Sequence, residues 1–209
     1  MTNLSAICDI QIGLTARGRL EPMDGGVPAI QLRDTTPDGD LGSDPVARFR
    51  LDDVPQRYWV GSGDILFRSR GDRNTAIALG ESFAEPAVAV MPLVILRPRE
   101  EVLTEYLAWY INQPRAQHHF DGYARGTGIR MIPMGCLAEL DVPLPALKQQ
   151  RTIAAIDSLG RREFILSMRL AEKRHQFTNA TLLRTARESV QNQLKETAAA
   201  LRPAKGGTS

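Results

Sequence analysis

Three polar segments carry the side chains best suited to contact another molecule through directed hydrogen bonds. Arg presents a planar guanidinium that can donate two parallel hydrogen bonds to a base edge or a phosphate, which Lys cannot do. Ser, Thr and Asn also hydrogen-bond to base edges when a scaffold positions them on loops. The candidate contact residues are Thr15, Arg17 and Arg19 in the first segment, Arg68, Ser69, Arg70, Arg73 and Asn74 in the middle segment, and Tyr123, Arg125, Thr127 and Arg130 in the third segment.

Each of these residues also has a plainer explanation, as a solvated surface side chain or as half of an ion pair. Asp72, for example, lies directly beside Arg73 in the sequence. A further basic patch is formed by Arg48 and Arg50, which flank Phe49. The segments therefore define a hypothesis about nucleic-acid contact, which depends on how the fold presents them.

Signatures of the common enzymatic chemistries do not occur in the sequence. It contains no phosphate-binding loop, no dinucleotide-binding glycine pattern, no serine-hydrolase elbow and no His-Glu-x-x-His. It also lacks the Asn/Asp-Pro-Pro-aromatic tetrapeptide of amino-methyltransferases. Three histidines and two cysteines, Cys8 and Cys136, form no metal-ligand spacing and no disulfide framework. A binding or scaffolding role is favoured over catalysis.

Charge divides the 209-residue chain into two parts. Residues 1–147 contain 14 Arg, no Lys and 19 acidic residues, for a net charge of −5. Residues 148–209 contain 12 basic and 5 acidic residues, for a net charge of +7. Exclusive use of Arg in the larger part suits bidentate recognition, and genomic base composition is the alternative explanation. The acidity of this part predicts that it binds nucleic acid weakly by itself.

Short apolar runs separated by turn residues predict a compact β-rich domain before residue 147. The strand candidates are residues 29–32, 64–67, 75–79 and 87–96. A helix is expected over Glu100–Asn112, where apolar side chains recur at helical spacing and two glutamates suit the positive end of the helix dipole, with Pro114 ending it. These elements must position the three polar segments.

Residues 148–201 contain no proline and one glycine, Gly160, which predicts one long helix or two helices broken there. About 50 helical residues would span ~75 Å, too long to be buried against a domain of this size. The helix therefore needs a partner helix, and we expect a loose antiparallel coiled coil. The residues of the predicted apolar stripe are Ile153, Ile156, Phe164, Met168, Ala171, His175, Leu182, Ala186, Val190 and Leu194. Residues 202–209 are expected to be a disordered tail.

The junction between the two parts carries motifs of a known family. Val142-Pro143-Leu144-Pro145 is followed by Gln150 and Ile153, in a Gln-x-x-Ile pattern that opens the helix. Residues 12–15, 28–34, 63–66 and 106–111 match further motifs of this family in the same order. Over residues 1 to about 200 the sequence resembles the specificity (S) subunits of type I restriction–modification systems. It resembles a half-length form, with one target recognition domain (1–147) and one helical spacer (148–201). The expected fold class is α+β.

The resemblance implies a subunit that reads double-stranded DNA and performs no chemistry itself. It implies recruitment of a DNA adenine methyltransferase subunit, on which S-adenosylmethionine would bind, so no cofactor is expected on this chain. An ATP-dependent restriction subunit is an optional further partner. Two copies related by a two-fold axis would read inverted half-sites, which predicts a homodimer on a bipartite DNA site. No membrane-spanning or secretory segment is found, and a cytoplasmic location is expected.

Two other functions fit parts of the sequence. The chain could be an assembly factor or inhibitor that acts on a methyltransferase complex through its helix and no longer reads DNA. Recruitment of the methyltransferase without sequence-selective DNA protection would favour this second function. An enzyme with an unrecognised site is the third alternative.

Overall fold

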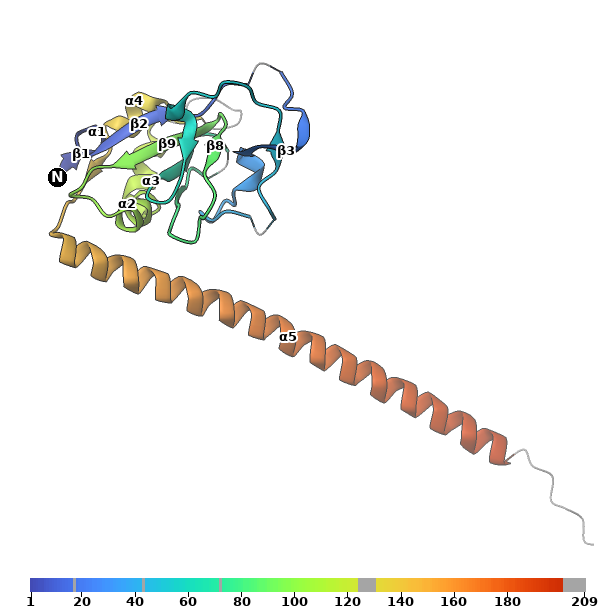
Figure 1. Cartoon of the computed structure of the whole chain (residues 1–209). Helices are drawn as coiled ribbons and strands as arrows, with labels where there is room; N and C mark the ends of the chain where they lie inside the picture. The colour runs from blue at the N-terminus through green and yellow to red at the C-terminus, as the bar shows by residue number, and fades with distance from the viewer. Residues whose placement is uncertain (17, 43, 72, 124–130, 201–209) are drawn as a thin grey trace, which may run out of the picture. The chain divides into compact units, whose positions relative to one another are not determined.

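The computed structural model describes residues 1–16, 18–42, 44–71, 73–123 and 131–200, with the side chains of 192 and 194–200 left out (Figure 1). The chain divides into two compact units, Met1–Asp157 and Ser158–Ser209. We call the first unit the β-rich domain. The second unit contains most of one long helix, α5 (Leu147–Ala200). The mixed sheets and the long C-terminal helix confirm the predicted α+β class.

Two four-stranded sheets form the β-rich domain. The first sheet is antiparallel throughout and has the order β2-β9-β6-β7, with strands Cys8–Ile12, Leu93–Pro98, Ile65–Arg68 and Ala76–Ala78. The second has the order β4-β3-β8-β5, with strands Arg48–Phe49, Pro22–Ile30, Ala87–Ala89 and Trp59–Val60, of which β3 and β8 run parallel. Two short strands, β1 (Thr2–Asn3) and β10 (Asp141–Val142), pair separately.

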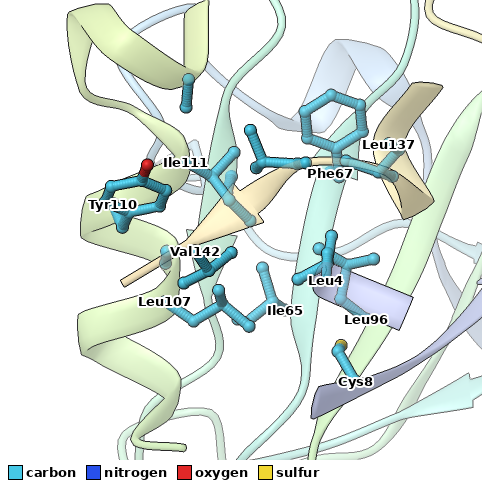
Figure 2. Packing of buried hydrophobic residues seen from close by; sticks show 14 of the residues in the cluster. Leu4, Cys8, Ile65, Phe67, Leu96, Leu107, Tyr110, Ile111, Leu137 and Val142 are labelled. Carbon is cyan, nitrogen blue, oxygen red and sulfur yellow. The ribbon is translucent and has the colours of Figure 1, made fainter. Parts of the chain in front are cut away.

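Helices cover one face of the first sheet. They are α1 (Leu4–Ile7), α2 (Thr104–Ile111), α3 (Pro114–Asp121) and α4 (Met134–Ala138). Two 3₁₀ turns lie elsewhere in the chain, at Leu32–Asp34 and Gln56–Tyr58. Figure 2 shows Leu107 and Ile111 of α2 directed toward Ile65 and Phe67 of β6. The rings of Phe67 and Phe120 lie 5.3 Å apart, centre to centre.

The first sheet is buried on both faces because neighbouring residues of a strand point in opposite directions. Ile65 and Phe67 of β6 pack among the helices, whereas Leu66 packs in a second cluster with Ile30 and Ala89 of the other sheet. Strands that are covered on both faces need apolar residues at every position. This explains the uninterrupted apolar runs of the sequence.

Two expected elements have different bounds in the structure. Residues 87–96 form two strands, β8 and β9, which belong to different sheets. Met91 and Pro92 separate them: Pro92 has no N–H to donate to a ladder, and the Met91 N–H bonds to the Leu14 carbonyl. The helix expected from Glu100 begins at Thr104, since Leu103 is extended and its N–H is bonded by a side chain. Pro114 opens α3 as well as following α2.

Helix α5 is continuous through Gly160, so the single-helix alternative is the one observed. Its first turns are fastened to the β-rich domain. Gln150 is fully buried, its Oε1 accepts a hydrogen bond from the Leu103 N–H at 2.8 Å, and its Nε2 donates to the carbonyls of Glu101 and Pro145. Gln150 and Ile153 pack on this domain, and the first compact unit ends at Asp157.

The segment leading into α5 is held by two tyrosines of α2. Tyr110 donates its hydroxyl hydrogen to the Asp141 carbonyl at 2.8 Å, and Tyr106 donates to the Pro143 carbonyl at 2.6 Å. Both aromatic rings are buried. Helix α2 therefore positions the start of α5. Among the helices of the described chain, none combines the length and apolar character needed to cross a membrane.

Candidate nucleic-acid interface

The first polar segment lies against the connection between β8 and β9. Leu14 forms a parallel bridge with Val90, and its carbonyl accepts a hydrogen bond from the Met91 N–H at 3.0 Å. Gly13 makes this approach possible, because a Cβ atom there would lie 2.8 Å from the carbonyl oxygens of both Ala89 and Leu93. Thr15 follows as an exposed residue, and its hydroxyl contacts the sulfur of Met91 at 3.8 Å.

The middle segment lies against the other side of the same connection. Ser69 donates its hydroxyl hydrogen to the carbonyl of Pro92, the residue after Met91. Its own carbonyl accepts a hydrogen bond from the Ile132 N–H at 2.8 Å. Arg70 then forms an antiparallel bridge with Met131, which directly follows the third segment. Main-chain contacts thus join the middle segment to the end of the third.

Three stretches that are far apart in the sequence are therefore neighbours. Residues 14–15 contact Met91, Ser69 contacts Pro92, and residues 131–132 pair with residues 69–70. The exposed side chains along this line are those of Thr15, Met91, Arg70 and Met131. We call these four residues the loop surface.

Three residues of the middle segment have positions that revise the sequence-based hypothesis. Arg68, Ser69 and Asn74 are buried, at 8%, 4% and 1% relative exposure. Arg68 donates to the carbonyl and hydroxyl oxygens of Thr35, and Asn74 donates to the Arg68 carbonyl at 2.9 Å. Because these side chains are buried and hydrogen-bonded inside the domain, Arg68, Ser69 and Asn74 shape the segment.

The middle segment also holds unusual buried polar groups. Within the described residues, Arg68 Nε, Asn74 Oδ1 and Thr75 Oγ1 are buried without a hydrogen-bond partner in the protein. Burial lowers the pKa of the Arg68 guanidinium. Buried unpaired polar atoms are uncommon in native proteins and cost stability. Departures of this kind from full hydrogen bonding are expected at functional or strained sites.

The other candidates on described residues have varied partners. Arg73 is exposed and pairs with Asp38 at 3.2 Å. Arg48 donates hydrogen bonds to both carboxylate oxygens of Glu85 at 2.6 Å. Arg19 is exposed. Tyr123 is 41% exposed and donates to Glu139 at 3.2 Å, a hydrogen bond that raises the pKa of its phenol. The candidates Arg17, Arg125, Thr127 and Arg130 lie outside the described residues.

Sequence reasoning missed the two methionines of the loop surface. Met91 is 45% exposed and Met131 is 57% exposed. Apolar side chains of this kind can contact the methyl group of thymine. The available signal was the proline that follows Met91 inside an otherwise continuous apolar run, which marks a break in the strand.

No grouping of three or more potential ligand residues that could hold a metal ion is present in the described part of the chain. Both cysteines are buried and unbridged. Burial raises the pKa of the Cys8 thiol to about 12 and that of the Cys136 thiol to about 11. Neither thiol is therefore activated as a nucleophile.

The apolar stripe predicted on α5 is exposed along the described helix. Exposure exceeds half for Ile156, Phe164, Met168, Leu182 and Val190, and Ala171, His175 and Ala186 are also exposed. Ile153 differs, since it is half-buried against the β-rich domain. The side chain of Leu194 is outside the described set. Large apolar side chains left in water at this density mark an interaction surface.

Comparisons of the sequence with protein-family models and with curated proteins find no match. Solved structures do match. The HsdS subunit from Thermoanaerobacter tengcongensis is 22% identical with a TM-score of 0.54, over 77% of this chain and 36% of that chain. A chain from a structure on complex assembly and conformational transition of the type I R-M system is 22% identical with a TM-score of 0.55, over 82% and 40%.

These likenesses show a shared fold. The matched part of this chain shares its fold with the matched part of the HsdS subunit. The chain spans about two fifths of the length of the structures it matches.

Proposed function

We propose that this chain is a DNA-reading specificity subunit of a type I restriction–modification methyltransferase. The observation that carries the proposal is the loop surface, on which segments from three distant parts of the sequence are joined by main-chain contacts. A rigid scaffold that presents side chains from several loops is how proteins read base edges. The shared fold with the HsdS subunit supports the same conclusion.

In this proposal the chain performs no chemistry. It binds double-stranded DNA and recruits an adenine methyltransferase subunit that carries S-adenosylmethionine, with or without an ATP-dependent restriction subunit. The net charge of −5 over residues 1–147 supports a division of labour. The loop surface supplies selectivity, and the partner subunits supply most of the phosphate contacts.

The proposal includes a homodimer formed through α5. The exposed apolar residues of this helix need a partner, and two copies related by a two-fold axis would place two loop surfaces on one duplex. The expected DNA site is bipartite, with inverted half-sites and an unread spacer.

Single-molecule sequencing of methylated adenine tests the proposal. Cells that contain the methyltransferase subunit are compared with and without this chain, and one bipartite motif is expected to be methylated only when the chain is present. A test variant carries Arg70→Ala on the loop surface, and this substitution should weaken methylation of that motif or relax its sequence.

The alternative is an assembly factor that acts through α5 without reading DNA. The burial of Arg68 and the ion pair of Arg73 favour it, since they leave fewer exposed, unpaired cations on the described loops. Co-purification of the methyltransferase without a methylated motif would decide for this alternative.

A further inference from the structure

Helix α5 carries a second apolar face that the predicted stripe does not contain. Leu159, Leu166, Leu170 and Phe177 are 67%, 54%, 52% and 75% exposed. Their spacings of seven, four and seven residues place them at a and d positions of heptad repeats. Glu163 and Lys173 occupy the two remaining a and d positions of this stretch, and both are exposed. We call the six residues the heptad face.

The heptad face and the predicted stripe lie on different sides of the helix. With 3.6 residues per turn, Phe164, Met168 and Leu182 are rotated by roughly 140–180° from the centre of the heptad face. The stripe is also interrupted by His175 and Thr178. The heptad face is the more regular surface for a coiled coil.

The heptad face is complementary to itself in one antiparallel arrangement. If two copies cross at a two-fold axis beside Met168, Leu159 faces Phe177 and Leu166 faces Leu170. In the same arrangement Glu163 of each copy faces Lys173 of the other. Each apolar residue then meets an apolar residue, and each charge meets the opposite charge. Heptad a positions face d positions at every layer.

Other arrangements leave charges without a suitable partner. A parallel pair in register would place Glu163 against Glu163 and Lys173 against Lys173. Moving the antiparallel pair by one heptad would place Glu163 against Leu166 in one direction, or Lys173 against Leu170 in the other. Charges buried against apolar side chains are costly, so polar residues at a and d positions select one register.

We propose that α5 pairs with the α5 of a second copy of this chain through the heptad face, antiparallel and centred on Met168. This deepens the homodimer in the proposed function and rests on it. The register sets the distance between the two β-rich domains. The two Asp157 residues, where these domains end, lie 22 residues apart along the paired helices, or about 33 Å.

That distance matches about one turn of B-DNA, which is ~34–36 Å. Two domains attached one turn apart would approach the same side of a duplex. It is less than half of the ~80 Å spanned by the 54 residues of α5. The spacer of the DNA site would therefore depend on the register of the heptad face, and not on the length of α5.

Charge reversal in the full-length chain tests the register. Glu163→Lys and Lys173→Glu should each weaken the dimer about tenfold or more in analytical ultracentrifugation, and the double variant should restore it. Leu166→Lys should also weaken it, whereas Met168→Lys, the matched control on the stripe, should not. Failure of the double variant to restore the dimer would overturn the register, and so would a monomeric parent chain.

Distance measurement provides an independent test. Ser158→Cys introduces an exposed thiol next to the unit boundary, while the native Cys8 and Cys136 are buried. Pulsed electron paramagnetic resonance between spin labels at this position should give about 30 Å. Adjacent labels would indicate a parallel pair, and about 45 Å would indicate antiparallel overlap of the whole of Leu147–Ala200. Either result would overturn the register. The proposed function is tested separately, by sequencing of methylated adenine, and it fails if no motif is methylated in the presence of the chain.

Discussion

Gln150 at the start of α5 binds the backbone of Leu103 at the start of α2. Its Oε1 accepts the Leu103 N–H at 2.8 Å, and the side chain is fully buried. This single carboxamide explains both why α2 begins at Thr104 and why the first turns of α5 belong to the β-rich domain. The proposed spacing of two β-rich domains by α5 requires the first turns of this helix to be held firmly. The hydrogen bonds of Gln150 hold them.

Gln150→Leu should lower the free energy of unfolding by about 2–3 kcal/mol, because the buried Leu103 N–H loses its acceptor. The measurement is urea unfolding followed by circular dichroism. Gln149→Leu is the matched control, since Gln149 is the exposed neighbour in the same helix turn. Equal stability of the two variants would contradict the anchoring role.

Gly13→Ala should destabilise the β-rich domain by about 1–3 kcal/mol, because the added methyl group has no room between the carbonyls of Ala89 and Leu93. The same substitution should also displace the first polar segment. Gly80→Ala is the control, since a Cβ atom there meets no other atom within 4 Å. Thermal unfolding compares the stability of the two variants. If the Gly13 variant is as stable as the control, the backbone at Gly13 does not approach Ala89 and Leu93 closely.

Substitutions of Arg68 and Arg70 are expected to have different effects, the first on the stability of the fold and the second on DNA recognition. Arg68→Met leaves the Thr35 carbonyl without its donor and should cost about 1–3 kcal/mol of stability. Arg70→Ala should leave stability within about 0.5 kcal/mol. Thermal unfolding measures both changes, and a stable Arg68 variant would argue against its structural role.

The role of Arg70 in recognition is measured by sequencing the methylated motif in cells that carry Arg70→Ala. A base contact should relax one position, by about 1–3 kcal/mol, whereas a phosphate contact should weaken all sequences alike. Arg99→Ala is the control, because Arg99 follows the opposite end of β9 from the loop surface. An unchanged motif in the Arg70 variant would remove this residue from the interface.

The two thiols should react slowly with iodoacetamide at pH 8 in the folded protein. Burial raises the pKa of Cys8 to about 12 and that of Cys136 to about 11, so both remain protonated thiols. In urea both should react quickly. Mass spectrometry counts the modified cysteines, and rapid modification of the native chain would show that the core of the domain opens readily.

These pKa shifts also predict alkaline destabilisation. Each thiol has a higher pKa when folded than the ordinary value of 9.0. Their contribution to stability is therefore complete below about pH 9 and is lost as the pH rises through about 11 and 12. Urea unfolding between pH 8 and pH 11 should show this decline, and Cys136→Ala should reduce its slope.

Apolar patterning alone indicated a β-rich domain followed by a helix, because buried strands and amphipathic helices leave local periodicities in the sequence. The Pro-Leu-Pro segment and the Gln-x-x-Ile motif likewise marked where the helix starts. The spacing of apolar residues in this helix contains the heptad face as well as the stripe through Phe164 and Met168.

Tertiary structure decided which polar residues are available for contact. In the sequence, Arg68 and Arg70 look alike, yet one is bound to Thr35 inside the domain and the other is exposed beside Met131. Only the fold could bring Thr15, Met91 and Met131 together, because main-chain pairing between distant segments leaves no local pattern. A sequence records the period of each element, whereas side-chain direction in a loop depends on what the loop packs against.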